Sequence, residues 1–341
     1  MRVLRTAAFS VRYRPRTLTA SAACALLALA AMVLTLGSGD YRIPPGEVLR
    51  SLFGGGTVGD HFIVVELRLP RVVTALLVGA ALALAGAVFQ SLVRNPLGSP
   101  DMLGFTEGAA TGALVVVVAG GSSLALACGA VIGGVLTGVG VYALAWRQGV
   151  HGYRLILVGI GVSAILSGVN GYLMTKAQLM DAARAMLWLT GSLDGRGWSD
   201  VAPLAVAMAV LVPVLLVGCG RALHVAEMGD DVARALGVPV ERARLTALAA
   251  AVLLASFAAA AAGPVSFVAL TSPQLAKRLT RAPGPNLIPS MLMGAVLLTC
   301  ADLLAQHAIP GRQLPVGVVT GVLGGGYLIW LLAAGRKAGR I

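Results

Sequence analysis

The residues of this chain whose types and spacing suggest a chemical role are basic residues at the ends of an apolar segment. Arg68 and Arg71 precede a charge-free run from Val72 to Val88, and Arg94 follows it. Guanidinium groups in such positions anchor a helix at the two edges of a bilayer, where the charged head reaches water. The run is rich in glycine and alanine and has the composition of a helix that crosses a membrane.

Polar residues inside apolar segments form the second group that could do chemistry, because placing them in a bilayer is costly. Asp302 lies about 14 residues into a segment that starts near Ile288, or roughly 21 Å along a helix. A proton relay at Asp302 would indicate a secondary transporter, whereas a hydrogen bond between helices serves packing alone; packing is favoured. Four further residues could line a pathway or pack helices: Gln90, Thr106, Glu107 and Asn170.

The cysteines and histidines do not have the spacing of a metal site or a disulfide framework. The cysteines lie in or beside apolar runs, which favours packing, and the histidines form no HxxxH-type pair. These residues are Cys24, Cys128, Cys219, Cys300, His61, His151, His224 and His307. The sequence also has no HxxxD motif or paired carboxylates of the kind that a membrane-embedded enzyme needs. We therefore expect no catalytic residue, no metal ligand and no cofactor bound by this chain.

The composition places the chain in a membrane. Of the 341 residues, 57% are hydrophobic and 12% are charged, and the mean hydropathy is +0.87, which is too apolar for a soluble domain. The net charge of +12 does not indicate nucleic acid, because the basic residues lie between apolar segments rather than along one face. The sequence predicts an all-α integral membrane protein with about ten transmembrane helices in contact with lipid.

The apolar runs predict ten spans in one domain, residues 18–333. A basic tail, residues 1–17, precedes the domain, and a second tail, residues 334–341, follows it. The predicted spans are 18–36, 71–91, 101–119, 123–146, 153–175, 201–219, 245–262, 265–281, 288–306 and 315–333. The third and eighth are short and interrupted by glycine or proline, so we expect broken or partly re-entrant helices there.

The distribution of basic residues sets the orientation. With ten spans, 18 Lys and Arg lie on the side of the two tails and 8 on the other, so the positive-inside rule places both termini in the cytoplasm. The basic start followed by an apolar run could imitate a secretory signal, but the run is long and is interpreted as a retained first helix. Glycines inside the spans, such as Gly79 and Gly86, indicate close helix packing.

The one long polar segment on the cytoplasmic side, residues 221–244, is predicted to form two short helices and a turn. Asp230 and Asp231 suit an N-cap and first turn, where carboxylates meet free N–H groups and the positive end of the helix dipole. Gly237 suits the position after a helix, and Pro239 suits the first turn of the next. From these residues alone, a solvated connector is the favoured interpretation.

The chain has no phosphate-binding loop of its own. No G-x-x-x-x-G-K-[ST] motif occurs, because none of the three lysines (Lys176, Lys277 and Lys337) follows a glycine. If transport is driven by ATP, a separate subunit must hydrolyse it.

Several long motifs resemble the FecCD family of ABC importer permeases. The segment Gln90–Gly98 reads Q-S-L-V-R-N-P-L-G, and Gly229–Val238 matches G-[DE]-x-x-A-R-x-L-G-[VL]. The motif Leu187–Leu193 (L-W-L-T-G-S-L), with Pro273-Gln274 where many relatives have Pro-His, is most similar to the ferric-enterobactin branch. The similar segments are Arg68–Gly104, Leu187–Trp198, Gly229–Val238, Gly263–Arg278 and Leu314–Leu323.

The resemblance implies a type II ABC importer permease architecture in the cytoplasmic membrane of a bacterium. It implies two ATPase subunits that bind ATP and Mg, and a periplasmic or lipoprotein siderophore-binding protein. It also implies a second FecCD-type permease chain, so a heterodimer of two different permeases is favoured. Docking of the binding protein is expected at Arg68, Arg71 and, on a looser match, Arg312. The residues expected to couple to the ATPase are Gly229, Asp230, Asp231, Ala233, Arg234, Leu236, Gly237 and Val238.

The function that the resemblance implies is import of a ferric siderophore, of the catecholate, enterobactin-like class. A bulky anion needs a wide pathway with weak contacts, because tight binding would slow its release. Import of heme or cobalamin by the same family is an alternative, and a proton-coupled secondary transporter is an alternative of another class.

Overall fold

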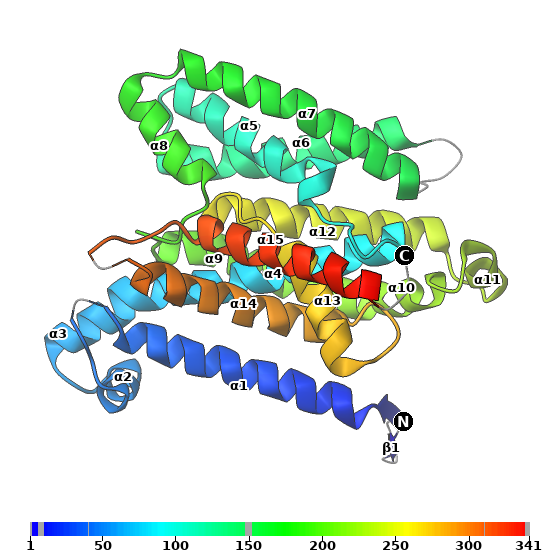
Figure 1. Cartoon of the computed structure of the whole chain (residues 1–341), viewed down its shortest axis with the longest axis horizontal. Helices are drawn as coiled ribbons and strands as arrows, with labels where there is room; N and C mark the ends of the chain where they lie inside the picture. Colours follow the sequence, from blue (N-terminus) through cyan, green and yellow to red (C-terminus); the bar gives the residue numbers. More distant parts are fainter. Residues whose placement is uncertain (1, 6–9, 40, 147–151, 310, 338–341) are drawn as a thin grey trace.

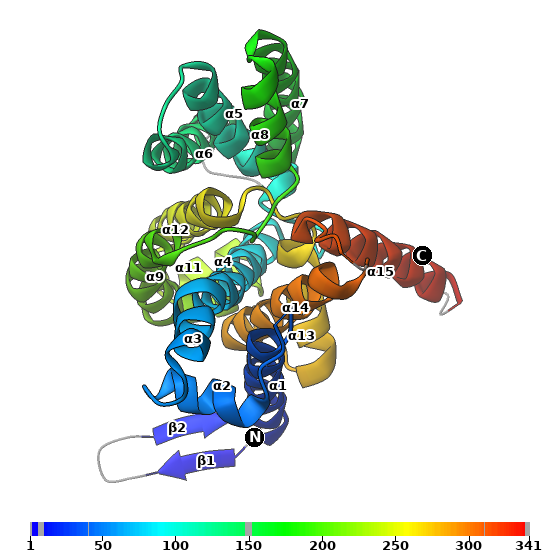
Figure 2. The ribbon, with the colours of Figure 1, turned by 90° about the vertical axis from the view of Figure 1, so that its left-hand side faces the viewer.

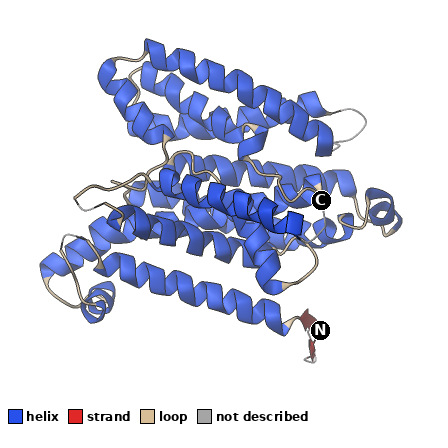
Figure 3. Cartoon of the chain, viewed as in Figure 1, coloured by secondary structure: helices blue, strands red, loops and turns tan. Residues whose placement is uncertain are grey.

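The computed structural model describes residues 2–5, 10–39, 41–146, 152–309 and 311–337. His151 and the last part of the predicted C-terminal tail lie outside these residues. The described chain is helical apart from a small antiparallel hairpin of β1 (Arg2–Arg5) and β2 (Ser10–Tyr13), in which Arg2 lies opposite Tyr13 (Figure 3). The hairpin lies within the predicted basic tail, so the prediction of an all-α membrane domain is confirmed.

The helices cover the predicted spans and also some of the connections between them. In chain order they are α1 (Pro15–Gly37), α2 (Pro45–Leu52), α3 (Val58–His61), α4 (Leu69–Val93), α5 (Phe105–Val118), α6 (Ser123–Ala145), α7 (Gly152–Lys176), α8 (Leu179–Leu189), α9 (Trp198–Pro213), α10 (Gly220–Ala226), α11 (Asp230–Ala235), α12 (Val240–Ala262), α13 (Val268–Thr280), α14 (Leu287–His307) and α15 (Val316–Lys337). Phe62–Arg68 and Val214–Cys219 are π-helical, and Asp101–Leu103 forms a 3₁₀ turn.

Seven continuous helical stretches of the described chain are long and apolar enough to cross a membrane. They are Pro15–Gly37, Val58–Val93, Ser123–Ala145, Gly152–Lys176, Trp198–Ala226, Val240–Ala262 and Leu287–His307. Each corresponds to a predicted span, although four of them are longer than predicted by several residues. The other three predicted spans correspond to α5, α13 and α15.

The third and eighth predicted spans are broken, as expected. α5 has 14 residues and α13 has 13, and at about 1.5 Å per residue neither reaches the roughly 30 Å of the hydrocarbon core. A left-handed residue precedes each helix: Gly104 with φ 80° and Phe267 with φ 69°. The backbone turns at these two points, and the helices begin inside the protein instead of at a membrane face.

Three features of the connections were not predicted. α2 and α8 are helices in segments to which the sequence assigned no structure, and the predicted span 201–219 continues to Ala226. The π-helical turn of that span follows Pro213, whose missing N–H removes one hydrogen bond of the ladder. The predicted second short helix after Gly237 is wrong, because the chain there begins the 23-residue helix α12.

The buried core is built around α4. This helix packs against α9, α12, α13 and α14, while α5, α6, α7 and α8 form a group that joins the rest mainly through contacts between α6 and α12 (Figures 1 and 2). A Cβ on Gly86 would overlap the carbonyl of Ala269, and one on Gly79 would overlap that of Gly294. Both predicted packing glycines therefore let helix backbones touch, as small residues do in membrane bundles.

The connections separate to the two ends of the bundle. Figure 1 shows α2, α3 and α8 at one end, and α11, β1 and the last turn of α15 at the other. The two termini therefore leave the bundle at the end that carries most of the basic residues, which the positive-inside rule assigns to the cytoplasm.

Candidate functional site

The outer end of the bundle holds a network around Arg71. Its guanidinium donates from Nη2 to Asp302 Oδ1 at 2.9 Å and from Nε to Oδ2 at 3.2 Å. The same group donates from Nη1 to Gln313 Oε1 at 2.7 Å and reaches Asp194 Oδ1 at 3.4 Å, while Gln306 Nε2 donates to Asp302 Oδ2 at 2.7 Å. The Asp302 side chain is only 1% exposed. Packing between α4 and α14 is thus the role that these contacts give Asp302.

The other two predicted docking arginines have different surroundings. Arg68 donates to the carbonyl oxygens of Leu36 and Tyr41, at 2.7 and 2.6 Å, and holds the loop that follows α1. Arg312 is exposed, and no hydrogen bond or ion pair of its side chain is found among the described residues. Of the three guanidinium groups, Arg312 is therefore the most accessible to a partner, and Arg68 and Arg71 organise the loops beside it.

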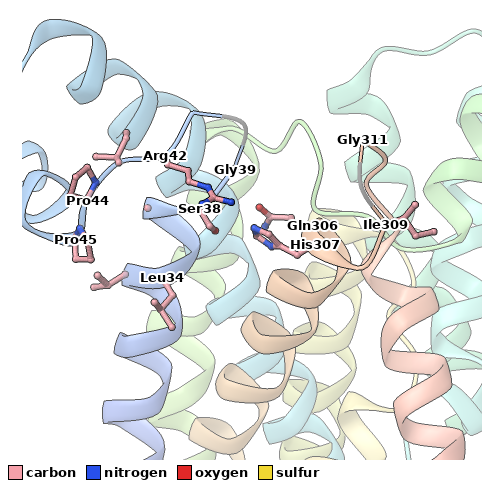
Figure 4. A pocket seen from close by; sticks show the side chains of 13 residues that line it. Leu34, Ser38, Gly39, Arg42, Pro44, Pro45, Gln306, His307, Ile309 and Gly311 are labelled. Carbon is pink, nitrogen blue, oxygen red and sulfur yellow. The ribbon is translucent and has the colours of Figure 1, made fainter.

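A cavity of about 730 Å³ opens at this end, between the loop after α1 and the end of α14. Figure 4 shows Arg42 on one wall and Gln306 and His307 on the other. The rest of its described lining is largely apolar and includes Leu34 and Pro44, and none of the lining residues that the structure describes is a carboxylate. The sequence analysis did not single out Arg42, because a lone arginine in a loop carries no motif.

Within the membrane domain, Gln90 belongs to a polar contact between α4 and α13. Its side chain is 3% exposed and donates to Leu270 O at 3.0 Å. Gln274 donates to Gln90 Oε1 at 2.6 Å and to Pro96 O at 3.0 Å. The Gln274 amide thus completes a contact that ties α13 to α4 and to the loop after it.

Of the remaining predicted polar residues, Asn170 and Glu107 join α5 to α7. Asn170 donates to Glu107 Oε2 at 2.9 Å and accepts from Thr111 at 2.7 Å. Thr106 donates to Asp101 Oδ1, in the turn before α5, at 2.7 Å. Thr111 was missed by the sequence analysis, since its role depends on a helix that lies beside it only in the fold. Each of these polar groups has a protein partner, as packing between membrane helices requires.

The predicted coupling segment forms the short helix α11. Gly229 is its N-cap with φ 114°, Asp230 and Asp231 lie in its first turn, and Gly237 follows it with φ 77°. Both glycines adopt backbone angles that other residues rarely adopt. Asp231 in the first turn and Gly237 after the helix lie as predicted, but Asp230 is not the N-cap, since Gly229 holds that position without a side-chain hydrogen bond. Pro239 is the N-cap of α12 instead of a residue in its first turn.

The two aspartates of α11 differ in their surroundings. Asp230 accepts from Arg94 and also from Arg244 Nη2, at 3.1 and 3.0 Å to its two oxygens. Asp231 is fully exposed and pairs with Arg234 at 3.2 Å on the same helix. Burial raises the pKa of the Asp230 carboxyl, but the hydrogen bonds and charges of Arg244 and Arg94 outweigh this, and its pKa lies below the usual value.

The outer face of α11 is apolar and exposed. Met228 just before the helix, Val232 within it and Leu236 at its C-cap are each more than two-fifths exposed. Ala233 is completely buried. An exposed apolar stripe at an aqueous end of a membrane protein is typical of a surface that contacts another protein.

Comparison with known proteins identifies the family of this fold. The model of the FecCD transport family matches residues 21–334. The chain belongs to the FecCD transport family. Over 315 residues it is 47% identical to the ferric enterobactin transport system permease protein FepG of Escherichia coli (strain K12), covering 91% of this chain and 94% of the relative. It is 39% identical to the achromobactin transport system permease protein CbrC of Dickeya dadantii (strain 3937), covering 91% and 90%.

The fold is also that of a solved ABC transporter. A metal-chelate type ABC transporter in an inward-facing conformation superposes with a TM-score of 0.81 and 26% identity, covering 93% of this chain and 99% of the other. The chain is therefore an ABC-type permease and a multi-pass protein of the cytoplasmic membrane. This family relation implies an ATPase and a binding protein as partners.

Proposed function

We propose that this permease subunit moves a ferric siderophore, of the catecholate class to which enterobactin belongs, across the cytoplasmic membrane. The observation that carries this proposal is the 47% identity to the ferric enterobactin permease FepG over nearly the full length of both chains. ATP and Mg belong to a separate ATPase subunit. No group of three or more His, Cys, Asp or Glu able to hold a metal occurs in the described part of the chain.

The proposed contact with the ATPase is α11 and the residues that flank it. Its support is the exposed stripe of Met228, Val232 and Leu236 beside a capped helix end. The coupling residues are Gly229, Asp230, Asp231, Ala233, Arg234, Leu236, Gly237 and Val238. In this arrangement Ala233 attaches α11 to the bundle and Leu236 contacts the partner.

A second permease chain, most simply a different one, is proposed to cover the face formed by α7 and α15. Gly161, Gly168 and Gly171 on α7 face open space, as do Gly321 and Gly325 on α15. Bare glycines in a membrane helix favour a close helix neighbour over lipid. Figure 2 shows α15 projecting from the bundle and α7 at the edge of its group. The siderophore would cross between the two chains.

A test of that interface replaces one of these glycines with a bulky residue. Gly168→Leu is expected to reduce recovery of the second permease chain in pull-down from detergent. Gly140→Leu is the matched control, because Gly140 on α6 also has open space around it but lies on a different face. Equal recovery of the partner with both variants would contradict the assignment.

For the binding protein we propose docking at the outer end, with Arg312 and Arg42 in direct contact. Arg68 and Arg71 contribute by holding the loops and keep their predicted place in this surface. The support is the exposed Arg312 and the cavity lined in part by Arg42 and His307. Arg42→Gln or Arg312→Gln is expected to weaken binding of the binding protein to nanodisc-embedded transporter. Arg50→Gln, on a residue already paired with Glu47 at 2.7 Å, serves as control.

The proposed function is tested by uptake of radiolabelled ferric enterobactin in cells that lack this chain. Wild-type chain is expected to restore uptake, and Arg234→Glu is expected not to, with ferrichrome and cobalamin as parallel substrates. Restoration of cobalamin uptake instead would assign the chain to the alternative substrate. Unchanged uptake of all three on deletion would contradict the proposal.

A proton-coupled transporter is the competing class, and Asp302 distinguishes it. In a proton-coupled transporter, a substitution that neutralises Asp302 abolishes uptake, and a substitution that disrupts α11 has no effect on uptake. The contacts of Asp302 with Arg71 and Gln306 favour the packing role. Uptake that persists when the proton gradient is collapsed and ATP is maintained would support the ATP-driven importer.

A further inference from the structure

The first residue of α11 connects three elements that lie far apart in the sequence. The Asp230 carboxylate accepts hydrogen bonds from Arg94, directly after α4, and from Arg244 on α12. α4 is the central helix of the bundle, and α12 packs directly against it. One carboxylate therefore ties a short peripheral helix to two of the helices that make up the core.

Both arginines are held firmly in place. Arg94 ends α4 in a left-handed conformation, with φ 54° and ψ 34°, and the turn that follows is closed by Asn95 Oδ1, which accepts from the Leu97 N–H at 2.9 Å. The Arg244 side chain is only 11% exposed, and it also donates to Glu241 at 3.4 Å. A pull on the carboxylate is thus transmitted to the backbone at the ends of α4 and α12.

The main chain on either side of α11 is a weaker connection. Gly229 precedes the helix and Gly237 follows it, both with positive φ. Glycine has a wide range of accessible backbone angles, so these turns bend easily. Charge-assisted hydrogen bonds are shorter and stronger than neutral ones, and here two of them converge on the first turn of the helix. The side chain of Asp230, more than the backbone, fixes α11 to the bundle.

We infer that Asp230 is the joint through which movement of α11 reaches α4 and α12, with Arg94 and Arg244 as its positioning residues. The inference rests on the proposed function, in which α11 contacts the ATPase. Arg94 and Arg244 are absent from the motif that identified the coupling segment. Arg94 and Arg244 therefore have a role in transport through their contact with Asp230, although neither lies on the exposed stripe of α11.

The neighbouring aspartate provides an internal comparison. Asp231 carries the same charge one residue further along, is fully exposed, and pairs with Arg234 of the same helix. A contact within one short helix moves with that helix and transmits nothing to the bundle. Asp231→Asn therefore changes the charge of α11 as Asp230→Asn does but leaves the joint intact.

The experiment reconstitutes the complete transporter in proteoliposomes and measures ATP hydrolysis and ferric-siderophore uptake in the same vesicles. Asp230→Asn is expected to lower uptake per ATP about tenfold, the loss typical of a charged hydrogen bond, while the ATPase stays bound and active. Asp231→Asn, at a residue of the proposed ATPase contact, is expected to lower ATP hydrolysis and uptake together, which leaves uptake per ATP unchanged. Asp230→Glu, which keeps the charge, is expected to recover part of the lost uptake.

A double-mutant cycle isolates the contact. Arg94→Gln alone is expected to lower uptake per ATP, and the double variant Arg94→Gln with Asp230→Asn is expected to lose no more than Asp230→Asn alone, because partners in one contact are not additive. If the double variant instead shows the product of the two single losses of uptake per ATP, the role of the joint is contradicted. Equal uptake per ATP in Asp230→Asn and Asp231→Asn would also contradict it. Loss of ATPase binding or of assembly in both Asp230→Asn and Arg94→Gln would contradict it as well. A wild-type complex that hydrolyses ATP but moves no siderophore would instead contradict the proposed function.

Discussion

The two ends of the bundle each contain an arginine–aspartate contact, and the two contacts differ in what they connect. At the outer end, Arg71 and Asp302 are 13% and 1% exposed and lie between α4 and α14, two helices that pack along their length. At the inner end, Asp230 is 28% exposed and holds the six-residue helix α11. The outer contact reinforces a junction that packing already makes. The inner contact replaces packing that a short helix cannot supply.

Burial determines how each contact responds to damage. A buried charge that loses its partner cannot be solvated, so its loss lowers the unfolding free energy of the whole protein. A half-exposed carboxylate or guanidinium is rehydrated, so the cost is limited to the lost hydrogen bonds. We therefore expect the outer contact to control stability and the inner contact to control the position of α11.

The largest effect is expected from Asp302→Ala. The change leaves the Arg71 guanidinium nearly buried without its main acceptor, which costs about 3 to 5 kcal/mol of unfolding free energy. Thermal unfolding of the purified chain in detergent measures this loss. The control is Asp194→Ala: Asp194 is 70% exposed and 3.4 Å from Arg71, so a change below about 1 kcal/mol is expected. Similar losses of unfolding free energy in Asp302→Ala and Asp194→Ala would show that burial of the carboxylate does not determine the size of the loss.

A smaller loss is expected from Asp230→Asn, of about 1.5 to 3 kcal/mol. Its pH dependence follows from the lowered pKa of Asp230. Because the folded-state pKa lies below the unfolded one, the stabilisation is complete above the ordinary Asp pKa of about 3.9 and is lost as the pH falls through the folded-state pKa. The difference in melting temperature between wild type and Asp230→Asn should therefore stay constant from pH 7 to 5 and shrink only at more acidic pH. A difference that disappears near neutral pH would contradict the lowered pKa.

Replacing both partners of the outer contact tests whether the ion pair itself stabilises the protein. Arg71→Met with Asp302→Leu removes both charges, and apolar replacements of a buried pair are often neutral, so we expect a net change below about 1 kcal/mol. The measurement is the same unfolding experiment, beside each single variant. A double variant as unstable as Asp302→Ala would show that Gln306 and Gln313, which also bond to the pair, need the charges.

The smallest effect is expected from Asp231→Asn. Its side chain is fully exposed and its partner Arg234 lies three residues away on the same helix, so almost no change in unfolding free energy is expected. Added salt should reduce even this, since exposed pairs are screened. If Asp231→Asn loses as much unfolding free energy as Asp230→Asn, the two aspartates do not differ in their contribution to stability.

Local features of the sequence predicted the elements well. Asp230 and Asp231 lie in the first turn of α11 and Gly237 lies just after its end, because helix ends depend on residues within one turn of each other. A helix start near Pro239 was also predicted. Its continuity with the span 245–262 was missed, because the first turns of α12 are polar and hydropathy alone does not detect a helix that extends out of the membrane.

The sequence by itself determined that the chain crosses a membrane many times, which end faces the cytoplasm, and which stretch forms the proposed coupling helix. Hydropathy, charge and capping are properties of neighbouring residues, so they can be read along the chain. Only the tertiary structure decided which charges meet. Arg71 pairs with a residue 231 positions away and Arg94 with one 136 positions away, because an ion pair depends on distance in space, which the packing of whole helices around α4 sets.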